Sequence, residues 1–424
     1  MNSNLKSFTK HTLALTAIAA SLALAACGGG GGGSSSPAAP ASGASTPVTP
    51  PPDQPASGGN VVTNPTGGQT GGSSSSTASV LAAPGAATVA GFTASGTGAD
   101  TGTAVETDSL TYINNVRAQV GLPALVDVAA VDVPAHNHSL YQQLNNSVGH
   151  YEVAGSPGYT GVSPMDRVTA VYPTQSVGEI AAGTSASNLS TFATSTQPID
   201  LLFDAPFHRG IILFDTTGVG IGHVDAGTLG GLNTYTADFV DYKAFVPDNE
   251  FVAWPYNGQT NVKPAWKADE SPNPLQAAYP QLVGSVVGYP ITLSAAGNGA
   301  YSNVAFSIKD AAGNPVTCAE VDSSNNAEAT RLAACVPIAP LAVNTTYTVT
   351  VTGDLTNTTI TTPLAFNVSW SFTTAASLSG GTNTTGPAVT YLPSPAVTAV
   401  TPNLAPAGSA ATIKAQTKSS VILR

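Results

Sequence analysis

A single acidic residue, Glu179, stands in the segment "VGEIAAG" (177–183), where every other side chain is small or apolar. Only 9% of the chain is charged, and a carboxylate buried in such surroundings is costly unless a charged or hydrogen-bonding group pairs with it. Imidazole groups are available, because five of the six histidines lie between residues 104 and 246. The chemistry of this region therefore depends on which partner Glu179 finds.

Several charged or titratable residues of the same region favour structural roles. His136 and His138 are two positions apart in a predicted helix, so their side chains do not face each other and a metal pair is not expected. His223 lies in a strand-like run and is predicted at the surface. Asp166 and Arg167 are predicted to cap or brace a loop.

Common catalytic motifs are missing from the sequence. It contains no Gly-x-Ser-x-Gly elbow, no Gly-x-x-x-x-Gly-Lys phosphate loop and no His-Glu-x-x-His zinc helix. The segment "GVGIG" (218–222) lacks the continuation of a dinucleotide site, and it is predicted to be a strand that needs close packing. The formal net charge of −11 argues against nucleic acid and anionic lipid head groups as partners.

Residues 1–27 are predicted to be an export signal. Two lysines precede an apolar stretch (12–24) that is too short to span a bilayer as a stable helix. The following "LAAC" resembles the lipobox of bacterial lipoproteins, which implies a diacylated Cys27 as the membrane anchor. Gly28 then favours the outer membrane as the location. An ordinary cleaved signal with an incidental cysteine is the alternative.

Composition divides the rest of the chain into four regions. Residues 28–103 are mostly Gly, Ser, Thr, Ala and Pro, with too little apolar area to offset the entropy of ordering, so a disordered tether is predicted. Residues 104–246 mix helical and strand patterns, whereas residues 247–375 show strands and turns. Residues 376–424 form a low-complexity tail. The predicted fold class is α+β, followed by an all-β domain.

Helical and strand patterns alternate in the first folded region. The predicted elements are a helix capped by Asp108 or Ser109 and closed by Gly121, a helix over 128–145 that Pro134 kinks or interrupts, a helix beginning at Pro198, and strands at 217–225 and 234–242. The second helix is predicted to carry Val133, Leu140 and Leu144 on one side. The two strands are predicted to form a hairpin.

The second folded region alternates with a period of two residues. In "TYTVTVTG" (346–353), Tyr347, Val349 and Val351 share one face and threonines share the other, as in an antiparallel sandwich. Cys318 and Cys335 remain as a pair in an exported protein, so a disulfide is predicted. Two free buried thiols are the alternative.

Six segments of the first region together resemble a known family. They are "INNVRAQVGLPAL" (113–125), "GH" (149–150), "SPMDR" (163–167), "VGEIAAG" (177–183), "APFHRGIIL" (205–213) and "GVGIG" (218–222). Their order and spacing resemble bacterial members of the CAP superfamily, the relatives of cysteine-rich secretory proteins, antigen 5 and plant pathogenesis-related proteins.

The resemblance implies an α-β-α sandwich whose cleft holds a His-Glu-Glu-His cluster, and His150, Glu179 and His208 match three of its members. Glu179 would then accept a hydrogen bond from an imidazole and fix its tautomer. Two imidazoles facing a cleft can hold Zn²⁺ or a similar cation, with Glu179 as a third ligand or as a group that orients an imidazole. The alternative is a structural cluster that binds nothing.

The sequence departs from the family pattern at three positions. Ile180 replaces the usual Asn, Leu202 stands where Trp is common, and Ala205 occupies the place of the second glutamate. Asp204 is adjacent, but on a helix it would point elsewhere. Fewer ligands imply a modest affinity for metal.

The leading hypothesis is a lipid-anchored binding protein for a lipid or sterol-like molecule or for an envelope or host protein. Its second domain resembles bacterial Ig-like modules that serve as spacers or adhesion elements. One alternative is a metal- or histidine-dependent hydrolase, such as a peptidase, with Glu179 or a histidine as general base. The missing second acid and the lack of an obvious nucleophile count against it. Another alternative is a surface adhesin that uses the CAP fold as a scaffold.

Overall fold

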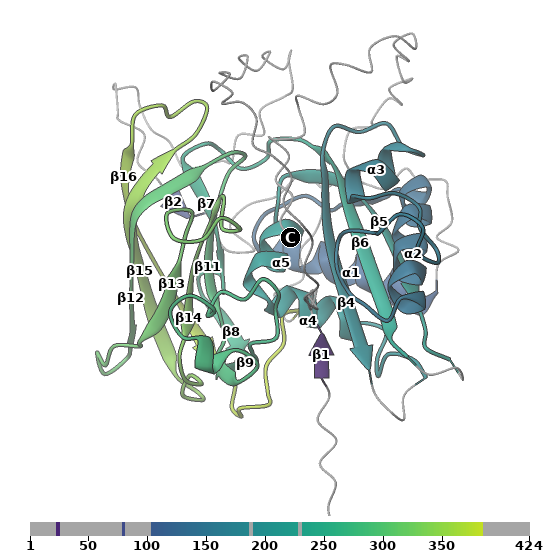
Figure 1. Ribbon diagram of the computed structural model, residues 1–424. Coiled ribbons are helices and arrows are strands. Elements are labelled where there is room, and N and C mark those ends of the chain that lie inside the picture. The colour runs from purple at the N-terminus through teal and green to yellow at the C-terminus, as the bar shows by residue number, and fades with distance from the viewer. Residues whose placement is uncertain (1–22, 26–78, 81–102, 186–189, 228–230, 385–424) are drawn as a thin grey trace, which may run out of the picture.

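Figure 1 shows the computed structural model of the chain. It describes residues 23–25, 79–80, 103–185, 190–227 and 231–384. Cys27, nearly all of the predicted tether and most of the predicted tail therefore lie outside the described residues. Within the described part, no helix has the length and apolar character that crossing a membrane requires.

Five helices belong to the first folded region. They are α1 (Ala104–Gln119), α2 (Ala129–Leu144), α3 (Pro164–Thr169), α4 (Gln197–Asp204) and α5 (Pro206–Ile212). The N-terminus of α1 lies earlier than the sequence predicts, because Thr103 is the N-cap and its N–H donates to Glu106 Oε2 at 2.7 Å. The predicted cap Ser109 is instead buried within the helix. Gly121 follows the helix with φ 78°, as predicted for its C-terminus.

The second helix forms where predicted, but without the interruption that Pro134 predicts. Pro134 is buried and does not interrupt α2, since packing against the sheet compensates for one lost backbone hydrogen bond. The predicted apolar side is largely exposed, with Val133 and Leu144 each 52% accessible. The buried side instead carries small and polar residues such as Ala135 and Ser139.

A mixed sheet forms the centre of this region, in the order β1-β4-β6-β5-β3. Its strands are β1 (Ala23–Ala25), β3 (Val126–Asp127), β4 (Val177–Ser185), β5 (Thr216–Val224) and β6 (Asn233–Tyr242). Strand β6 pairs antiparallel with both β4 and β5, so the predicted hairpin is confirmed.

Helices cover both faces of this sheet (Figure 1). Successive strand residues point to opposite faces, and on β5 the glycines point toward α2 while Val219 and Ile221 point toward α1, α4 and α5. A Cβ at Gly222 would lie only 2.2 Å from the backbone N of His136. The predicted close packing of "GVGIG" is therefore confirmed, and the close approach brings the polar side of α2 onto the sheet.

The second folded region consists of β-strands, apart from a short 3₁₀ turn (Pro280–Leu282). The strands are β7 (Glu250–Trp254), β8 (Gln259–Val262), β9 (Ala265–Lys267), β10 (Val286–Gly288), β11 (Ile291–Ala295), β12 (Ala300–Asp310), β13 (Cys318–Val321), β14 (Leu332–Pro337), β15 (Thr346–Thr356) and β16 (Leu364–Thr374).

Two sheets of this region carry the alternating strands predicted for a sandwich. One has the order β13-β14-β11-β7-β2, where β2 is Ser79–Val80, and the other has the order β12-β15-β16-β8. A third, two-stranded sheet joins β9 and β10. The predicted disulfide between Cys318 and Cys335 is present and joins β13 to β14. The chain thus has mixed helix and sheet content, mostly β.

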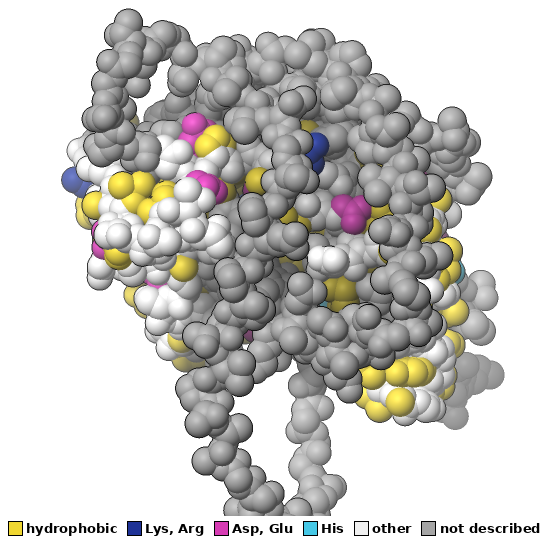
Figure 2. All heavy atoms as spheres, turned by 90° about the horizontal axis from the view of Figure 1, so that it is seen from above, with side chains coloured by type: hydrophobic (Ala, Val, Ile, Leu, Met, Phe, Trp, Pro, Cys, Tyr) yellow, Lys and Arg dark blue, Asp and Glu magenta, His cyan; other side chains and the backbone are white. Residues whose placement is uncertain are grey.

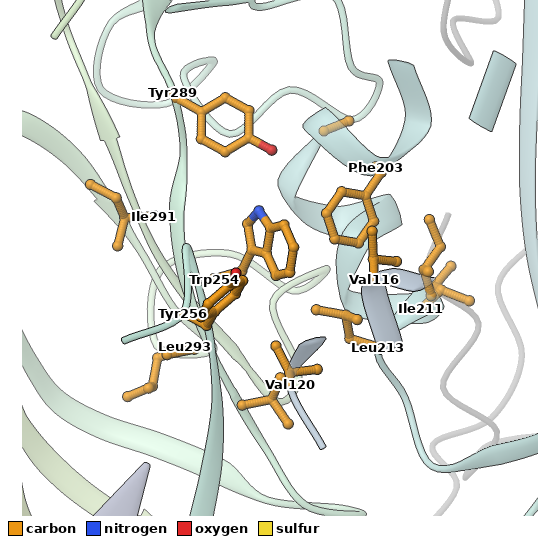
Figure 3. Close-up of a cluster of buried hydrophobic side chains, with 14 of the residues drawn as sticks. Val116, Val120, Phe203, Ile211, Leu213, Trp254, Tyr256, Tyr289, Ile291 and Leu293 are labelled. Atoms are coloured by element: carbon orange, nitrogen blue, oxygen red, sulfur yellow. The ribbon is translucent and has the colours of Figure 1, made fainter. Parts of the chain in front are cut away.

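The two folded regions share one continuous apolar core (Figure 3). The indole ring of Trp254 on β7 packs edge-on against the Phe203 ring of α4, with centroids 4.7 Å apart. Val116 and Val120 of the first region lie in the same cluster as Tyr289 of the second. Helices α4 and α5 are therefore buried between the mixed sheet and the sandwich.

Candidate functional site: a buried cluster of charged side chains

Six titratable side chains gather on the face of the mixed sheet that α2 and α3 cover. This Glu179 cluster consists of His138 on α2, His150 and Glu152 in the connection that follows α2, Arg167 on α3, Glu179 on β4 and Asp238 on β6. All six residues are less than 5% exposed.

Glu179 has two partners, an imidazole and a guanidinium. His150 Nδ1 lies 2.9 Å from Glu179 Oε1, and Arg167 Nη2 donates to Glu179 Oε2 at 2.5 Å. Because a carboxylate can only accept, the proton of this His150 bond lies on Nδ1. The expected hydrogen bond between an imidazole and Glu179 is thus present, and it sets the tautomer of His150.

Arg167 has a larger role than the sequence indicates. The N-terminus of α3 forms a capping box, in which Ser163 and Asp166 bond each other's backbone N–H, and this places Arg167 on the buried side of the helix. Its guanidinium also donates to the backbone O of His150 at 3.2 Å. It therefore braces the connection after α2, as predicted, and also supplies the countercharge of Glu179.

A second ion pair lies beside the first. His138 Nδ1 lies 2.9 Å from Glu152 Oε1, and His138 Nε2 lies 2.6 Å from the backbone O of Gly149. A carbonyl oxygen only accepts, and so does an ionised carboxylate, so both ring nitrogens of His138 face hydrogen-bond acceptors. His136, by contrast, is exposed, so the two histidines do not act as a pair, as the sequence predicts.

The charges of the cluster decide the protonation of its acids. Burial alone would raise the pKa of Glu179, but the positive charge of Arg167, together with the nearby imidazole of His138 and the hydrogen bond from His150, holds that pKa well below its usual range. Asp238 lies directly opposite Glu179 in the register of β4 and β6. Burial first, and then the charge of Glu179, raises the pKa of Asp238 well above its usual range. One acid of the pair is ionised and the other keeps its proton.

Glu152 fixes the shape of the segment 150–162, which we name the cluster loop. Glu152 Oε2 accepts the backbone N–H of Thr160 at 2.6 Å and of Gly161 at 3.2 Å. Burial opposes ionisation of Glu152, but these bonds and the one from His138 lower its pKa. The negative charge of Glu152 is therefore used to close the loop.

The third predicted site residue, His208, pairs with another acid. His208 Nδ1 lies 2.7 Å from Glu270 Oε1, which also accepts the backbone N–H of Phe207 at 2.8 Å and of His208 at 3.0 Å. Helix α5, which carries His208, packs on the sheet face opposite the Glu179 cluster. Sequence reasoning missed Glu270, because it lies 62 residues further on, in the second folded region.

His223 was wrongly predicted at the surface. Its residue is only 7% exposed, and its Nδ1 lies 3.2 Å from Glu106 Oε1 of α1. The alternation along β5 turns His223 toward α1, where the capping box of Thr103 holds Glu106 in place. His223 therefore braces α1 against the sheet.

The donor set of the Glu179 cluster does not fit a cation site well. Both oxygens of Glu179 are engaged, and the guanidinium beside them would repel a divalent ion. Among the residues that the structure describes, no group of three or more His, Cys, Asp or Glu is arranged to hold a metal ion. Zinc binding by His150, Glu179 and His208 stays a prediction from the sequence.

Residues 290–374, which contain β11 to β16, match the family model of the bacterial Ig-like domain. A comparison with curated proteins finds no match.

Two solved structures show partial likeness to the chain. An extracellular protein containing an SCP domain from Bacillus anthracis str. Ames has 22% identity and a TM-score of 0.26, over 32% of this chain and 40% of that one. CopC from Methylosinus trichosporium OB3b has 15% identity and a TM-score of 0.20, over 31% of this chain and 94% of that one. TM-scores this low do not establish a common fold.

Proposed function

We propose that this chain is a lipid-anchored, extracytoplasmic member of the CAP superfamily that acts as a binding protein. The anchor would be Cys27 and the location the outer membrane. The partner would be a lipid or sterol-like molecule or a protein of the envelope or of a host. The disulfide between Cys318 and Cys335 supports an oxidising compartment, and Ig-like sandwiches are frequent in cell-surface proteins.

The cluster loop carries the proposal of binding. Glu152 is buried, whereas the residues on either side of it point outward. The side chains of four large residues of the loop are exposed: Tyr151 (46%), Val153 (66%), Tyr159 (38%) and Val162 (48%). Since the ion pairs already hold the loop in place, these side chains can meet a partner with little loss of conformational entropy. Rigid loops that present tyrosine beside small residues are typical of binding surfaces.

The distribution of charge suits a neutral partner. Glu152 is the only charged residue of the cluster loop, and it is buried. Figure 2 shows hydrophobic side chains among a smaller number of acidic and basic ones on the described part of the face seen from above. A partner recognised by apolar and hydrogen-bonding contacts fits this surface better than a highly charged one.

The test compares the full chain, prepared without acyl groups, with the variant Val153→Ser/Val162→Ser. We expect saturable cosedimentation with isolated envelope fragments, or saturable binding of a neutral sterol in calorimetry, and an affinity about tenfold lower in the variant because two apolar contacts are lost. Val286→Ser is the matched control, since Val286 is 60% exposed on β10. Equal binding by both variants and the wild type, or no binding at all, would contradict the proposal.

The hydrolase alternative has less support. A general base works best with a pKa near the working pH, whereas Arg167 holds the pKa of Glu179 far below it. Titration of Zn²⁺ into the full chain and into His150→Ala/His208→Ala tests this alternative by calorimetry. Stoichiometric binding that the variant loses, together with turnover of a peptide library that His208→Ala abolishes, would favour the hydrolase.

A further inference from the structure

A lysine and two aspartates meet where the two folded regions join. Asp200 and Asp204 lie four positions apart on α4, so both point to the same side of the helix. Lys263, between β8 and β9, places its Nζ 2.6 Å from Asp200 Oδ2 and 2.8 Å from Asp204 Oδ2. The amine thus contacts two carboxyl groups at once, and one of them belongs to the last residue of the helix.

We propose that Lys263 and Asp204 form an intramolecular amide (isopeptide) bond that covalently joins α4 to the Ig-like half of the molecule. Asp200 is the proton carrier of this reaction, and Asn383 holds the acyl oxygen. This proposal rests on the contacts of the junction and does not depend on the binding function proposed above.

Asn383 completes the set of groups that the reaction needs. Its Nδ2 donates to Asp204 Oδ1 at 2.9 Å, on the carboxyl oxygen that does not face the amine. Tyr289 OH donates to Asn383 Oδ1 at 2.8 Å and fixes the orientation of the amide. An N–H already aimed at an oxygen that gains negative charge stabilises the tetrahedral intermediate of acyl transfer.

The surroundings exclude most water from the amine and its acceptor. The side chains of Lys263 and Asp204 are 16% and 11% exposed, whereas that of Asp200 is 35% exposed. Phe203, Trp254 and Tyr289 belong to the adjoining apolar core. Burial raises the pKa of Asp204. Burial opposes the charge of Lys263, but the carboxylates of Asp204 and Asp200 raise the pKa of its amine, so the ion pair is the resting form and the reaction proceeds through the less populated neutral amine and carboxylic acid.

The reaction balances without any further reactant. One proton of the Lys263 ammonium passes to Oδ2 of Asp204, the neutral amine attacks Cγ, and Asp200 accepts the second proton from Nζ. The Nζ–Cγ bond forms, the Cγ–Oδ2 bond breaks, and Oδ2 leaves as water with the two protons that the ammonium has lost, one of them returned by Asp200. An ammonium and a carboxylate thus become one amide and one water molecule.

Intact-mass spectrometry of the reduced, denatured chain tests the proposal. The wild-type chain should be lighter than its sequence by the mass of one water molecule, and proteolysis should yield a branched peptide that joins Lys263 to Asp204. A wild-type chain at its full mass would overturn the proposal. A deficit of one ammonia instead of one water would assign the acyl group to Asn383 and overturn the role of Asp204.

Two variants and one control locate the chemistry. Lys263→Arg keeps a cation between the two aspartates but cannot form the amide, and Asp200→Asn removes the proton carrier, so both should show the full mass. Lys267→Arg is the matched control, because Lys267 Nζ lies 2.6 Å from Asp269 Oδ2 but is 46% exposed. Lys267→Arg should still be lighter than its sequence by the mass of one water molecule. A deficit that persists in Lys263→Arg would contradict the proposal.

Discussion

The cost of burying Glu179 explains the residues around it. An ionised carboxylate without exposure to water must be compensated by charge and hydrogen bonds, and the structure supplies both through Arg167 and His150. The same guanidinium bonds the backbone O of His150. Charge compensation and loop position are therefore produced by one side chain.

Glu179→Gln should be strongly destabilising. The amide keeps the shape of the side chain but removes the nearest countercharge of Arg167 and leaves it only Glu152, whose Oε1 lies 3.7 Å from Nε, which costs about 3 kcal/mol. Urea unfolding measures the loss. Asp248→Asn changes an exposed acid and should stay within about 0.5 kcal/mol of the wild type. A loss for Glu179→Gln as small as that of the control would show that Glu179 is not the countercharge.

The titration of Asp215 should make the stability of the protein depend on pH. Burial raises the pKa of Asp215 to about 6 against the opposing charges of Arg331 and Arg117, whereas an unfolded aspartate has a pKa of about 4. Between these values the folded chain binds the extra proton, so the contribution of Asp215 to stability falls as pH rises from about 4 to about 6.

Asp215→Asn removes this titration and can keep the hydrogen bond from the backbone N–H of Val246. As pH rises from 4 to 7, we expect the free energy of unfolding of the variant to increase by about 2–3 kcal/mol relative to that of the wild type. Urea unfolding at each pH provides the two curves. Parallel curves would mean that the pKa of Asp215 is not raised.

Some contacts of the buried charged residues could be predicted from the sequence, and others could not. The pairing of His150 with Glu179 could be predicted because both lie in segments with a recognisable family pattern. Glu270 could not be predicted, since a lone acid in a loop of the second region gives no sign that it caps α5. His223 was misplaced for a similar reason, because its burial depends on where α1 packs.

At the scale of elements, the glycines of β5 set the distance of α2 from the sheet. The period-two pattern predicted the strand and the need for close packing, but not the helix face that meets it. The spacing placed Val133 and Leu144 on one side of the helix, and such an apolar side usually marks the core face. At so close a contact only small side chains fit, so Ala135 and Ser139 are buried instead.

Gly222→Ala tests that close contact. The new methyl group would lie 2.2 Å from the backbone N of His136, so α2 would have to move, at a cost of about 3 kcal/mol. Gly149→Ala is the matched control, because no atom lies within 4 Å of its added Cβ. Thermal unfolding of the two variants should separate them clearly. Equal stabilities would indicate that α2 does not press on β5.

At the scale of the whole molecule, the two folded regions should unfold together. Arg209 on α5 donates to the backbone O of Pro290 at 2.8 Å, and its guanidinium lies 4.9 Å from the centre of the Tyr289 ring. Composition alone predicted two successive regions, and it could not show that the helices of one fill the core of the other. Amino-acid composition and hydrophobic patterns along a chain do not show which of its regions contact each other.

Scanning calorimetry tests this coupling. The full chain should unfold in one transition, because the core is continuous across the junction. A fragment of residues 104–246 should be unstable, since it would expose Phe203 and the buried side of α5 to water. Two separate transitions in the full chain, or a fragment as stable as the full chain, would contradict a shared core.

The Glu179 cluster holds the cluster loop in the shape on which the proposed binding depends. Hydrogen exchange tests it most directly, in the wild type and in Glu152→Gln, at the amides of Thr160 and Gly161, whose N–H groups bond Glu152. We predict that the variant exchanges these two amides about tenfold faster, because hydrogen bonds to a charged acceptor are lost, while amides of β5 and β6 are unchanged. Equal exchange rates of the Thr160 and Gly161 amides in both proteins would mean that Glu152 does not hold the cluster loop in place.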